Sequence, residues 1–493
     1  MPTTAIFRSM SCGAVRTASH RAKAISHHMM STTTSSISEP TVKFESNSAL
    51  RSYILDRPSK RNALDEQMLT LLRPKIEEWS ASDLCGTIVG RGSGSVFCCG
   101  GDVASVIQNA ADPATRPKAM DFFKREFEMD YILAALKKPY VVIMDGITMG
   151  GGVGLAAPAP FRVATENTQF AMPEAKIGYF PDVGGSYFLS RLDGEIGTYL
   201  ALTSQTLKGR AVFEYGFATH FIPSRRIPML LDRLAELDQP HPSLVDHTLE
   251  ELSSERDDSE PPALFTGRLR VALDSAFSHS NVERIFKDLT TLLQDDDATV
   301  RQWASDSLEM LAMRSPTSLK VALKAIRQGK RMTLREALEM ELKIASAFCS
   351  GASPDFNIGV KAVLIEKLKT RPEWSPSSLE EVSEDIVSRF FEPTSPYVSS
   401  APQLEIPEHL AAEAISIPMR YALPSEDEIG AVIRGSHSSG GEMGTRAEDV
   451  LARFAELRPG KLGVKEKVLE VIQRRCKVTD NADGNFVWLK WIH

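Results

Sequence analysis

Short apolar runs, glycine-rich loops and amphipathic segments alternate along the first half of the chain. Apolar and polar residues alternate over 51–56, which predicts a strand. Apolar residues recur every three or four positions from 62 to 79, which predicts a helix capped by Asn62 or Asp65. A continuous apolar run, 139–144, predicts a buried strand. Because strand, loop and helix repeat in this order, the pattern predicts an α/β fold.

Two glycine-rich loops, 91–102 and 145–154, each lie between a predicted strand and a predicted helix. Backbone N–H groups at a helix N-terminus carry partial positive charge and favour an anion. N–H groups from both loops aimed at one oxygen would form an oxyanion hole. Neither loop continues into the Gly-Lys-Ser/Thr of a nucleotide-binding loop. Taken alone, each loop is equally well explained by a tight turn that needs glycine for a positive φ.

A third loop, 173–185, carries two carboxylates, Glu174 and Asp182, each directly after a proline. A carboxylate pair beside an oxyanion hole suits acyl transfer to water, because one group attacks or activates water and the other handles the leaving-group proton. The residues alone favour a plainer interpretation, in which Asp182 caps the next helix and Glu174 is a solvated loop residue. Glu126, on a predicted helix with two other acidic residues, gives no signal of its own.

Five segments form a specific set: 56–64, 97–102, 138–141, 146–154 and 170–185. Together they resemble the crotonase (enoyl-CoA hydratase/isomerase) superfamily over roughly residues 42–391, and within it the branch that hydrolyses 3-hydroxyisobutyryl-CoA. The resemblance implies an α/β fold with a crotonase-type ββα spiral core, a C-terminal helical region and an additional C-terminal extension. It also implies hydrolysis of that thioester to 3-hydroxyisobutyrate and CoA in valine catabolism. Coenzyme A would be part of the substrate, with no separate cofactor and no metal.

The resemblance assigns catalytic roles to particular residues. The backbone N–H groups of Cys99 and Gly151 would polarise the thioester carbonyl as an oxyanion hole. Glu174 and Asp182 would be the catalytic carboxylates. Hydratases of the superfamily carry a second glutamate just after the triple glycine, where this chain has Gly154. Addition of water to a double bond is therefore not expected.

The resemblance also implies a binding site for an acyl-CoA substrate. Glu126 and Gly151 would line the acyl pocket. Arg57, Lys60 and Arg61 fall where the fold usually meets the phosphates of coenzyme A, and cationic side chains suit that contact.

The second half of the chain is mainly helical in pattern. A capping box at 333–336 predicts the start of an amphipathic helix. We predict a catalytic core over 40–230, a helical region over 231–395 and an extension of unknown role over 396–493. Because the extension contains no catalytic motif, we expect a chain that ends near Pro393 to fold and to keep its activity.

The first 38 residues predict import into mitochondria. They contain no Asp or Glu but several basic residues among many Ser and Thr, which is typical of a transit peptide, although a merely disordered tail is the alternative. We expect a matrix location. The whole chain has 57 basic and 64 acidic residues and a formal net charge of −7, which excludes a wholly basic nucleic-acid binder. We expect no membrane contact, because no apolar run is long enough to span one.

Two functions of different classes fit these observations. The first is a mitochondrial thioesterase, in a fungal form. The second is a component of the fungal mitochondrial ribosomal small subunit, which contains a protein similar to the hydrolase. Ribosome association through the extension would use a local basic patch, although a solvated helix face is the plainer interpretation. The candidate residues of that patch are Lys461, Lys465, Lys467, Arg474, Arg475 and Lys477. The sequence leaves the oligomeric state open.

Overall fold

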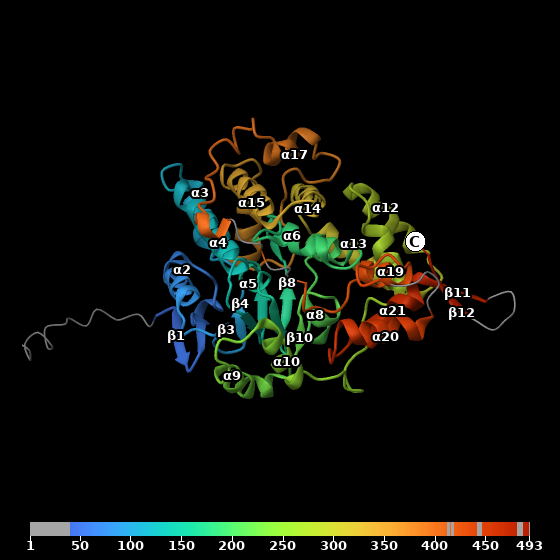
Figure 1. The fold of residues 1–493 in the computed structure, drawn as a ribbon. Coiled ribbons are helices and arrows are strands. Elements are labelled where there is room, and N and C mark those ends of the chain that lie inside the picture. The colour runs from blue at the N-terminus through green and yellow to red at the C-terminus, as the bar shows by residue number, and fades with distance from the viewer. Residues whose placement is uncertain (1–39, 412–414, 416–418, 441–445, 481–486, 493) are drawn as a thin grey trace, which may run out of the picture. The chain divides into compact units, whose positions relative to one another are not determined.

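The computed structural model describes residues 40–411, 415, 419–440, 446–480 and 487–492 (Figure 1). The predicted transit peptide, 1–38, lies outside these residues. Everything below concerns the compact unit Thr41–His493. Within its described part, no helix is both long enough and apolar enough to cross a membrane.

The larger sheet has six strands in the order β1-β2-β3-β5-β7-β10. Its strands are β1 (Val42–Asn47), β2 (Leu50–Leu55), β3 (Thr87–Gly92), β5 (Tyr140–Met144), β7 (Phe161–Ala164) and β10 (His220–Phe221). The first two form an antiparallel hairpin, in which Val42 lies opposite Leu55. The remaining neighbours are parallel, so their carboxyl ends share one edge of the sheet.

A second sheet has four strands in the order β4-β6-β8-β9. Its strands are β4 (Val96–Cys98), β6 (Ile147–Met149), β8 (Gln169–Ala171) and β9 (Leu207–Lys208). Three strands of the larger sheet continue directly into it: β3 into β4, β5 into β6 and β7 into β8. This repetition is the predicted ββα core, and it delivers each glycine-rich loop to a helix N-terminus.

Helices cover both faces of the larger sheet. The helices of the first half are α2 (Glu66–Ala81), α3 (Val103–Ala111), α4 (Arg116–Ala134), α5 (Gly151–Ala156), α6 (Gly185–Phe188), α7 (Ile196–Thr203), α8 (Arg210–Glu214), α9 (Ile227–Ala235) and α10 (Pro242–Leu252). Asp65, rather than Asn62, caps α2, because its side chain accepts a hydrogen bond from the Met68 N–H. On one face, Leu230 of α9 and Leu249 of α10 belong to the same apolar cluster as strand residues of the sheet.

The later helices begin with α11 (Gly267–Phe277), α12 (Val282–Leu292), α13 (Ala298–Ala312), α14 (Pro316–Gly329), α15 (Leu334–Cys349), α16 (Asp355–Gly359) and α17 (Glu384–Phe391). Single-turn 3-10 segments occur at η1 (Pro58–Lys60), η2 (Glu174–Ile177), η3 (Leu189–Arg191) and η4 (Ser224–Arg226), and η5 (Val360–Ile365) is a π-helix. The predicted capping box opens α15: Thr333 and Glu336 each bond the backbone N–H of the other.

The extension contributes α18 (Glu408–Ala411), α19 (Glu426–Ile433), α20 (Ala447–Leu457), α21 (Val464–Arg475) and the hairpin β11 (Cys476–Asp480) and β12 (Val487–Trp491). It belongs to the same compact unit as the core and is not a separable tail. Val398 and Leu404 are buried in the main apolar cluster. Tyr421 stacks on Phe161 of β7, with ring centroids 4.5 Å apart. Truncation near Pro393 would therefore expose apolar core residues that the extension covers, which the sequence-based expectation of an independently folded chain did not include.

Most of the basic residues proposed as an RNA-binding patch are used inside the protein. Lys461 pairs with Glu250 at 2.6 Å and Lys467 pairs with Asp193 at 2.6 Å. Arg474 and Arg475 converge on Glu426, which Arg270 of α11 also approaches, at 3.3 Å. Only Lys465 and Lys477 of the six are exposed. The predicted patch is therefore wrong, because four of its charges join the extension to the core or lie buried within that junction.

Glu426 is the centre of this junction. Its side chain is 8% exposed, and burial alone would raise its pKa, but the hydrogen bond and charge of Arg474 and the charges of Arg270 and Arg475 lower the pKa to about 2. Glu426→Gln should lower the free energy of unfolding by about 3–5 kcal/mol, since it leaves buried guanidinium groups without their counter-charge. The difference from wild type should shrink as the pH falls from about 4.5 towards 2.

Urea unfolding of the full chain measures this effect. Glu456→Gln is a matched control, because Glu456 is 71% exposed and pairs with Arg453 at the surface. The control should change stability by less than about 1 kcal/mol. Equal losses in the two variants would show that the junction adds nothing beyond a surface ion pair.

Candidate active site

Two carboxyl groups lie against the N-terminus of α5. Gly151 is the first residue of this helix, so its N–H has no acceptor within the helix. A Cβ on Gly151 would overlap Oε1 of Glu126, and a Cβ on Gly150 would lie 2.9 Å from Oε1 of Glu174. The glycines therefore allow both carboxyl groups to approach the helix N-terminus.

Burial excludes the plainer interpretations of the third loop. Glu174 begins the short η2 turn after β8, and both it and Asp182 are only 5% exposed. Asp182 makes no side-chain cap bond to α6, whose N-cap residue is Gly184. Glu174 is therefore not a solvated loop residue, and Asp182 is not a helix cap.

Aromatic rings wall this loop. Tyr179, between the two carboxylates in sequence, stacks on Phe356 with ring centroids 4.5 Å apart and on Phe123 of α4 at 5.7 Å. These rings exclude water from the loop and lower its local polarity. An ionised carboxylate is consequently costly here unless a partner compensates its charge.

Glu341 holds the end of the same loop and was missed from the sequence. This fully buried residue of α15 accepts hydrogen bonds from the Gly184 N–H at 2.6 Å and the Ser186 N–H at 2.9 Å. It therefore fixes the chain that follows Asp182. The available signal was a glutamate on the apolar stripe of α15, next to Leu342 and three residues after Leu338.

The buried carboxyl groups resist ionisation. Burial raises the pKa of both Glu126 and Glu174 to about 8. It also raises the pKa of Asp182, to which the charges of Glu126, Glu174 and Glu341 add. Oε1 of Glu126 and Oε2 of Glu174 have no hydrogen-bond partner within the described residues. Both groups are thus free to meet a bound molecule.

Asp130, one turn after Glu126 on α4, is a second residue that sequence reasoning missed. It is fully buried, and neither carboxyl oxygen has a hydrogen-bond partner among the described residues. A Cβ on Gly154 would lie 2.9 Å from both oxygens. Asp130 therefore lies against the position where hydratases of the resembled superfamily carry their second glutamate.

The first glycine-rich loop approaches the second. A Cβ on Gly100 would lie 3.8 Å from the Gly151 nitrogen, so the loops meet as an oxyanion hole requires. The Cys99 N–H donates a hydrogen bond to the Arg61 carbonyl oxygen at 3.2 Å. That group has an acceptor in this structure, and its oxyanion role stays a prediction.

The three basic residues predicted to meet coenzyme A differ in their surroundings. Arg57 donates to Asp102 at 3.0 Å and lies 3.4 Å from Asp65, whereas Lys60 and Arg61 are exposed. Arg57 and Asp102 line a cavity of about 540 Å³. Other residues of this cavity are Lys118 and Phe122, and the Phe122 ring also lies against Gly101 of the first glycine-rich loop.

These features define an α/β protein with paired buried carboxyl groups at a helix N-terminus. The family described as enoyl-CoA hydratase/isomerase matches residues 50–391, and the chain belongs to this family. The chain is also similar to a solved carnitinyl-CoA dehydratase from Mycobacterium thermoresistibile. The identity is 30% and the TM-score 0.64, covering 72% of this chain and 97% of that one.

Two relatives of this chain are named for different functions. The chain is 40% identical over 342 residues to the mitochondrial 3-hydroxyisobutyryl-CoA hydrolase of Gallus gallus, covering 69% of this chain and 85% of the relative. It is 38% identical over 463 residues to the small ribosomal subunit protein mS47 of Neurospora crassa, covering 90% of this chain and 87% of the relative.

The raised pKa of Glu126 predicts how stability changes with pH. The folded protein keeps a proton that the unfolded chain releases near pH 4.5, so stability should fall as the pH rises from about 4.5 to about 8. The loss is roughly 1.4 kcal/mol for each unit of pKa difference. Glu126→Gln removes this contribution and should make the dependence less steep, while the raised pKa of Glu174 keeps part of it.

Urea unfolding across that pH range measures the slope. Glu448→Gln, an exposed change on α20, should keep the wild-type slope. An unchanged slope in Glu126→Gln would mean that Glu126 ionises normally in the folded protein.

Proposed function

We propose that this protein hydrolyses a CoA thioester in the mitochondrial matrix, with 3-hydroxyisobutyryl-CoA as substrate. The observation that carries the proposal is the pair of nearly buried carboxyl groups, Glu174 and Asp182, in the loop beside the N-terminus of α5. The hydrolase relatives, which are named as mitochondrial, supply the substrate and the compartment. Gly154 in place of a second glutamate favours hydrolysis over hydration.

In the proposed reaction, the thioester carbonyl oxygen accepts hydrogen bonds from the Gly151 N–H and from the first glycine-rich loop, at Cys99. Negative charge then develops next to the positive end of α5, where it is stabilised. Cys99 can take part only if its bond to Arg61 opens when substrate binds.

Glu174 acts on the carbonyl carbon in one of two ways, each in its ionised form, which is the smaller fraction at neutral pH because burial raises its pKa to about 8. As a general base it takes a proton from water, whose oxygen forms the new C–O bond as the C–S bond breaks. As a nucleophile its carboxylate forms an anhydride with the acyl group as the C–S bond breaks and the CoA thiolate leaves, and water then opens the anhydride. In both routes the CoA thiolate receives a proton, which Asp182 would supply.

Substrate binding divides between two regions. Glu126, whose Oε1 faces Gly151, would line the acyl pocket. Lys60 and Arg61 are exposed and would meet the CoA phosphates. Arg57 also lines the adjoining cavity, but it already pairs with Asp102, so its contribution to phosphate binding would be smaller.

Substitution of the carboxylates tests this function. Glu174→Gln should lower turnover of 3-hydroxyisobutyryl-CoA by roughly 10²- to 10⁴-fold, since it keeps the shape but removes the base or nucleophile. Asp182→Asn should also lower turnover strongly. Affinity for a non-hydrolysable analogue should change little, because the phosphates and backbone N–H groups hold it. Release of the CoA thiol measures turnover, with Glu448→Gln as the surface control.

Near-normal turnover in both Glu174→Gln and Asp182→Asn would show that these two residues are not the catalytic carboxylates. Retained turnover in Glu448→Gln together with loss in both variants supports it. Comparison of 3-hydroxyisobutyryl-CoA with unbranched acyl-CoAs in the same assay tests the proposed substrate.

One observation favours a second candidate, a component of the mitochondrial ribosomal small subunit. The similarity to mS47 covers 90% of this chain, and therefore reaches into the extension, whereas that to the Gallus gallus hydrolase covers 69%. The extension's paired cations cannot supply the contact with RNA, so ribosome contact would use another surface.

Sedimentation of a mitochondrial lysate separates the two candidates. The second candidate predicts that the chain moves with the small subunit, and that Glu174→Gln moves with it too, because the carboxylate is buried away from any docking surface. A single slow peak of free protein would remove the second candidate and leave the first intact.

A further inference from the structure

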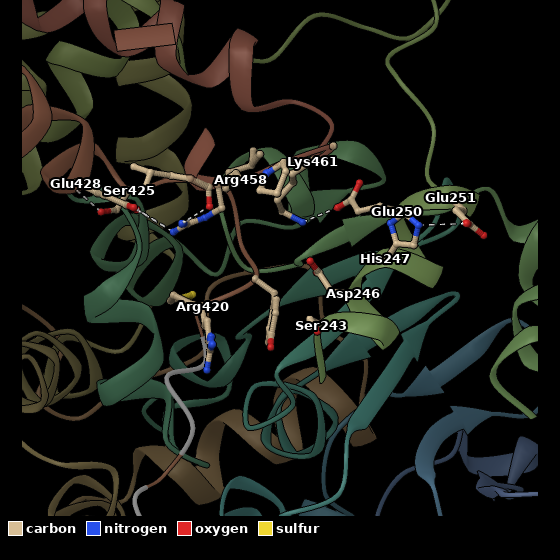
Figure 2. A pocket seen from close by; sticks show the side chains of 16 residues that line it. Ser243, Asp246, His247, Glu250, Glu251, Arg420, Ser425, Glu428, Arg458 and Lys461 are labelled. Atoms are coloured by element: carbon tan, nitrogen blue, oxygen red, sulfur yellow. Dashed lines mark hydrogen bonds and ion pairs between the residues drawn. The ribbon is translucent and has the colours of Figure 1, made fainter. Parts of the chain in front are cut away.

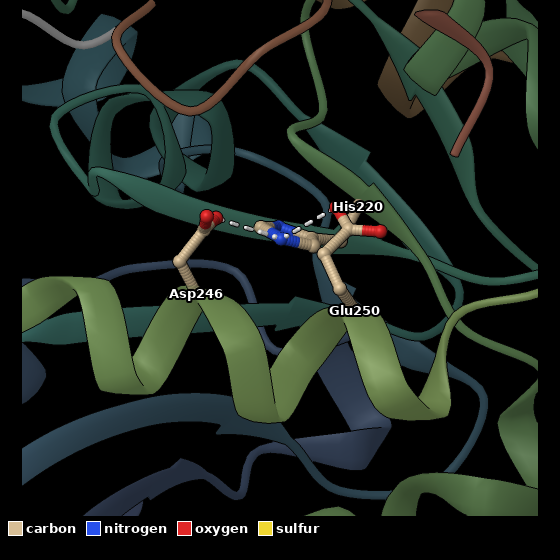
Figure 3. A group of neighbouring side chains, drawn as sticks. All are labelled: His220, Asp246 and Glu250. Carbon is tan, nitrogen blue, oxygen red and sulfur yellow. Dashed lines mark ion pairs between the residues drawn. The ribbon is translucent and has the colours of Figure 1, made fainter. Parts of the chain in front are cut away.

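A histidine and two carboxylates meet outside the candidate active site (Figure 3). His220, on β10, has no exposed surface. Its Nε2 lies 3.1 Å from Oδ1 of Asp246 and 3.2 Å from Oε1 of Glu250, both on α10. Despite these separations, Nε2 makes no well-aligned hydrogen bond within the described residues.

The other ring nitrogen indicates which tautomer is present. The Thr219 hydroxyl accepts a hydrogen bond from the Arg162 N–H at 2.8 Å and donates to the Arg162 carbonyl oxygen at 3.1 Å. When its proton goes to that carbonyl, this hydroxyl is an acceptor for Nδ1–H of His220, 2.9 Å away. In the neutral ring, Nε2 then carries a lone pair that faces two carboxylate oxygens.

This arrangement needs positive charge at Nε2. Asp246 and Glu250 carry two negative charges, and Lys461 supplies one positive charge through its 2.6 Å contact with Oε1 of Glu250. One negative charge therefore remains beside a neutral imidazole. A proton on Nε2 would balance it, although neither carboxylate oxygen makes a well-aligned hydrogen bond with that nitrogen.

A metal cation would also account for the two separations at Nε2. With bonds of about 2.0–2.2 Å to nitrogen and oxygen, a metal holds neighbouring ligand atoms roughly 3 Å apart. The Thr219 contact to Nδ1 is the outer hydrogen bond that metal-bound histidines usually make. Asp246 and Glu250 also line a cavity of about 830 Å³ (Figure 2), from which water can complete the coordination.

We propose that His220, Asp246 and Glu250 bind a divalent transition-metal cation such as Zn²⁺. The site fastens β10 to α10 where Lys461 of the extension also attaches. Lys461 competes with the metal for Glu250, so removal of the Lys461 charge should strengthen metal binding. The inference is independent of the proposed thioesterase, since none of these residues belongs to the candidate active site.

Titration of the metal-free full chain with Zn²⁺ tests the site. Calorimetry should find one saturable equivalent in the wild type. His220→Gln and Asp246→Asn should each weaken binding at least about tenfold, because changes to outer-shell partners alone cost 10–100-fold. Lys461→Met should bind Zn²⁺ more tightly than the wild type. Co²⁺ in place of Zn²⁺ gives a visible spectrum that should change in Asp246→Asn, a half-exposed position where folding is least at risk.

His247→Gln is the matched control. His247 lies on the same helix and is 72% exposed, so it reports adventitious histidine binding. This variant should bind Zn²⁺ as the wild type does. Loss of binding in the control alone, or equal affinity in wild type, His220→Gln and Asp246→Asn, would overturn the proposal.

Discussion

The candidate active site depends on one constraint, which is that its carboxyl groups are buried away from water. Glu126, Asp130, Glu174, Asp182 and Glu341 are all at most 5% exposed. Their ionisation has to be compensated by backbone N–H groups, and the structure supplies these at the N-termini of α5 and α6. Glu341 receives such bonds directly at α6, whereas Glu174 and Glu126 lie against the start of α5, and one carboxyl oxygen of each has no hydrogen-bond partner among the described residues. Substrate would therefore meet Glu174 and Glu126 as buried carboxyl groups that their raised pKa keeps mainly protonated near neutral pH.

A second use of charge organises the extension. Glu426 gathers three arginines from two parts of the chain, and Lys461 and Lys467 reach core carboxylates. Buried ion pairs of this kind contribute little net stability compared with apolar packing, but they are costly to break once formed. The extension is thus held in one position relative to the core. A segment fixed in this way presents the same surface to any partner.

The α/β core could be predicted from the sequence because its signals are local, whereas the roles of Glu174 and Asp182 came from the resemblance to the crotonase superfamily, since the residues alone favoured a solvated loop residue and a helix cap. Glycine-rich loops after apolar runs indicate strand-to-helix junctions, and the prolines before Glu174 and Asp182 mark an ordered loop. Asp130 and Glu341 could not be assigned in this way, since which face of a helix is buried depends on packing against distant elements. Composition also misled at the extension, because a run of basic residues does not show whether its partner is RNA or a carboxylate of the same chain.

The central claim is that burial keeps Glu174 and Glu126 protonated near neutral pH until substrate binds. Infrared difference spectra of the substrate-free protein test it most directly, by comparing wild type with Glu174→Gln and with Glu126→Gln at about pH 6.5. The account predicts that the protonated-carboxyl band is stronger in the wild type than in either variant, and that this difference disappears well above pH 8. Loss of an ionised-carboxylate band instead, at about pH 6.5, would contradict it.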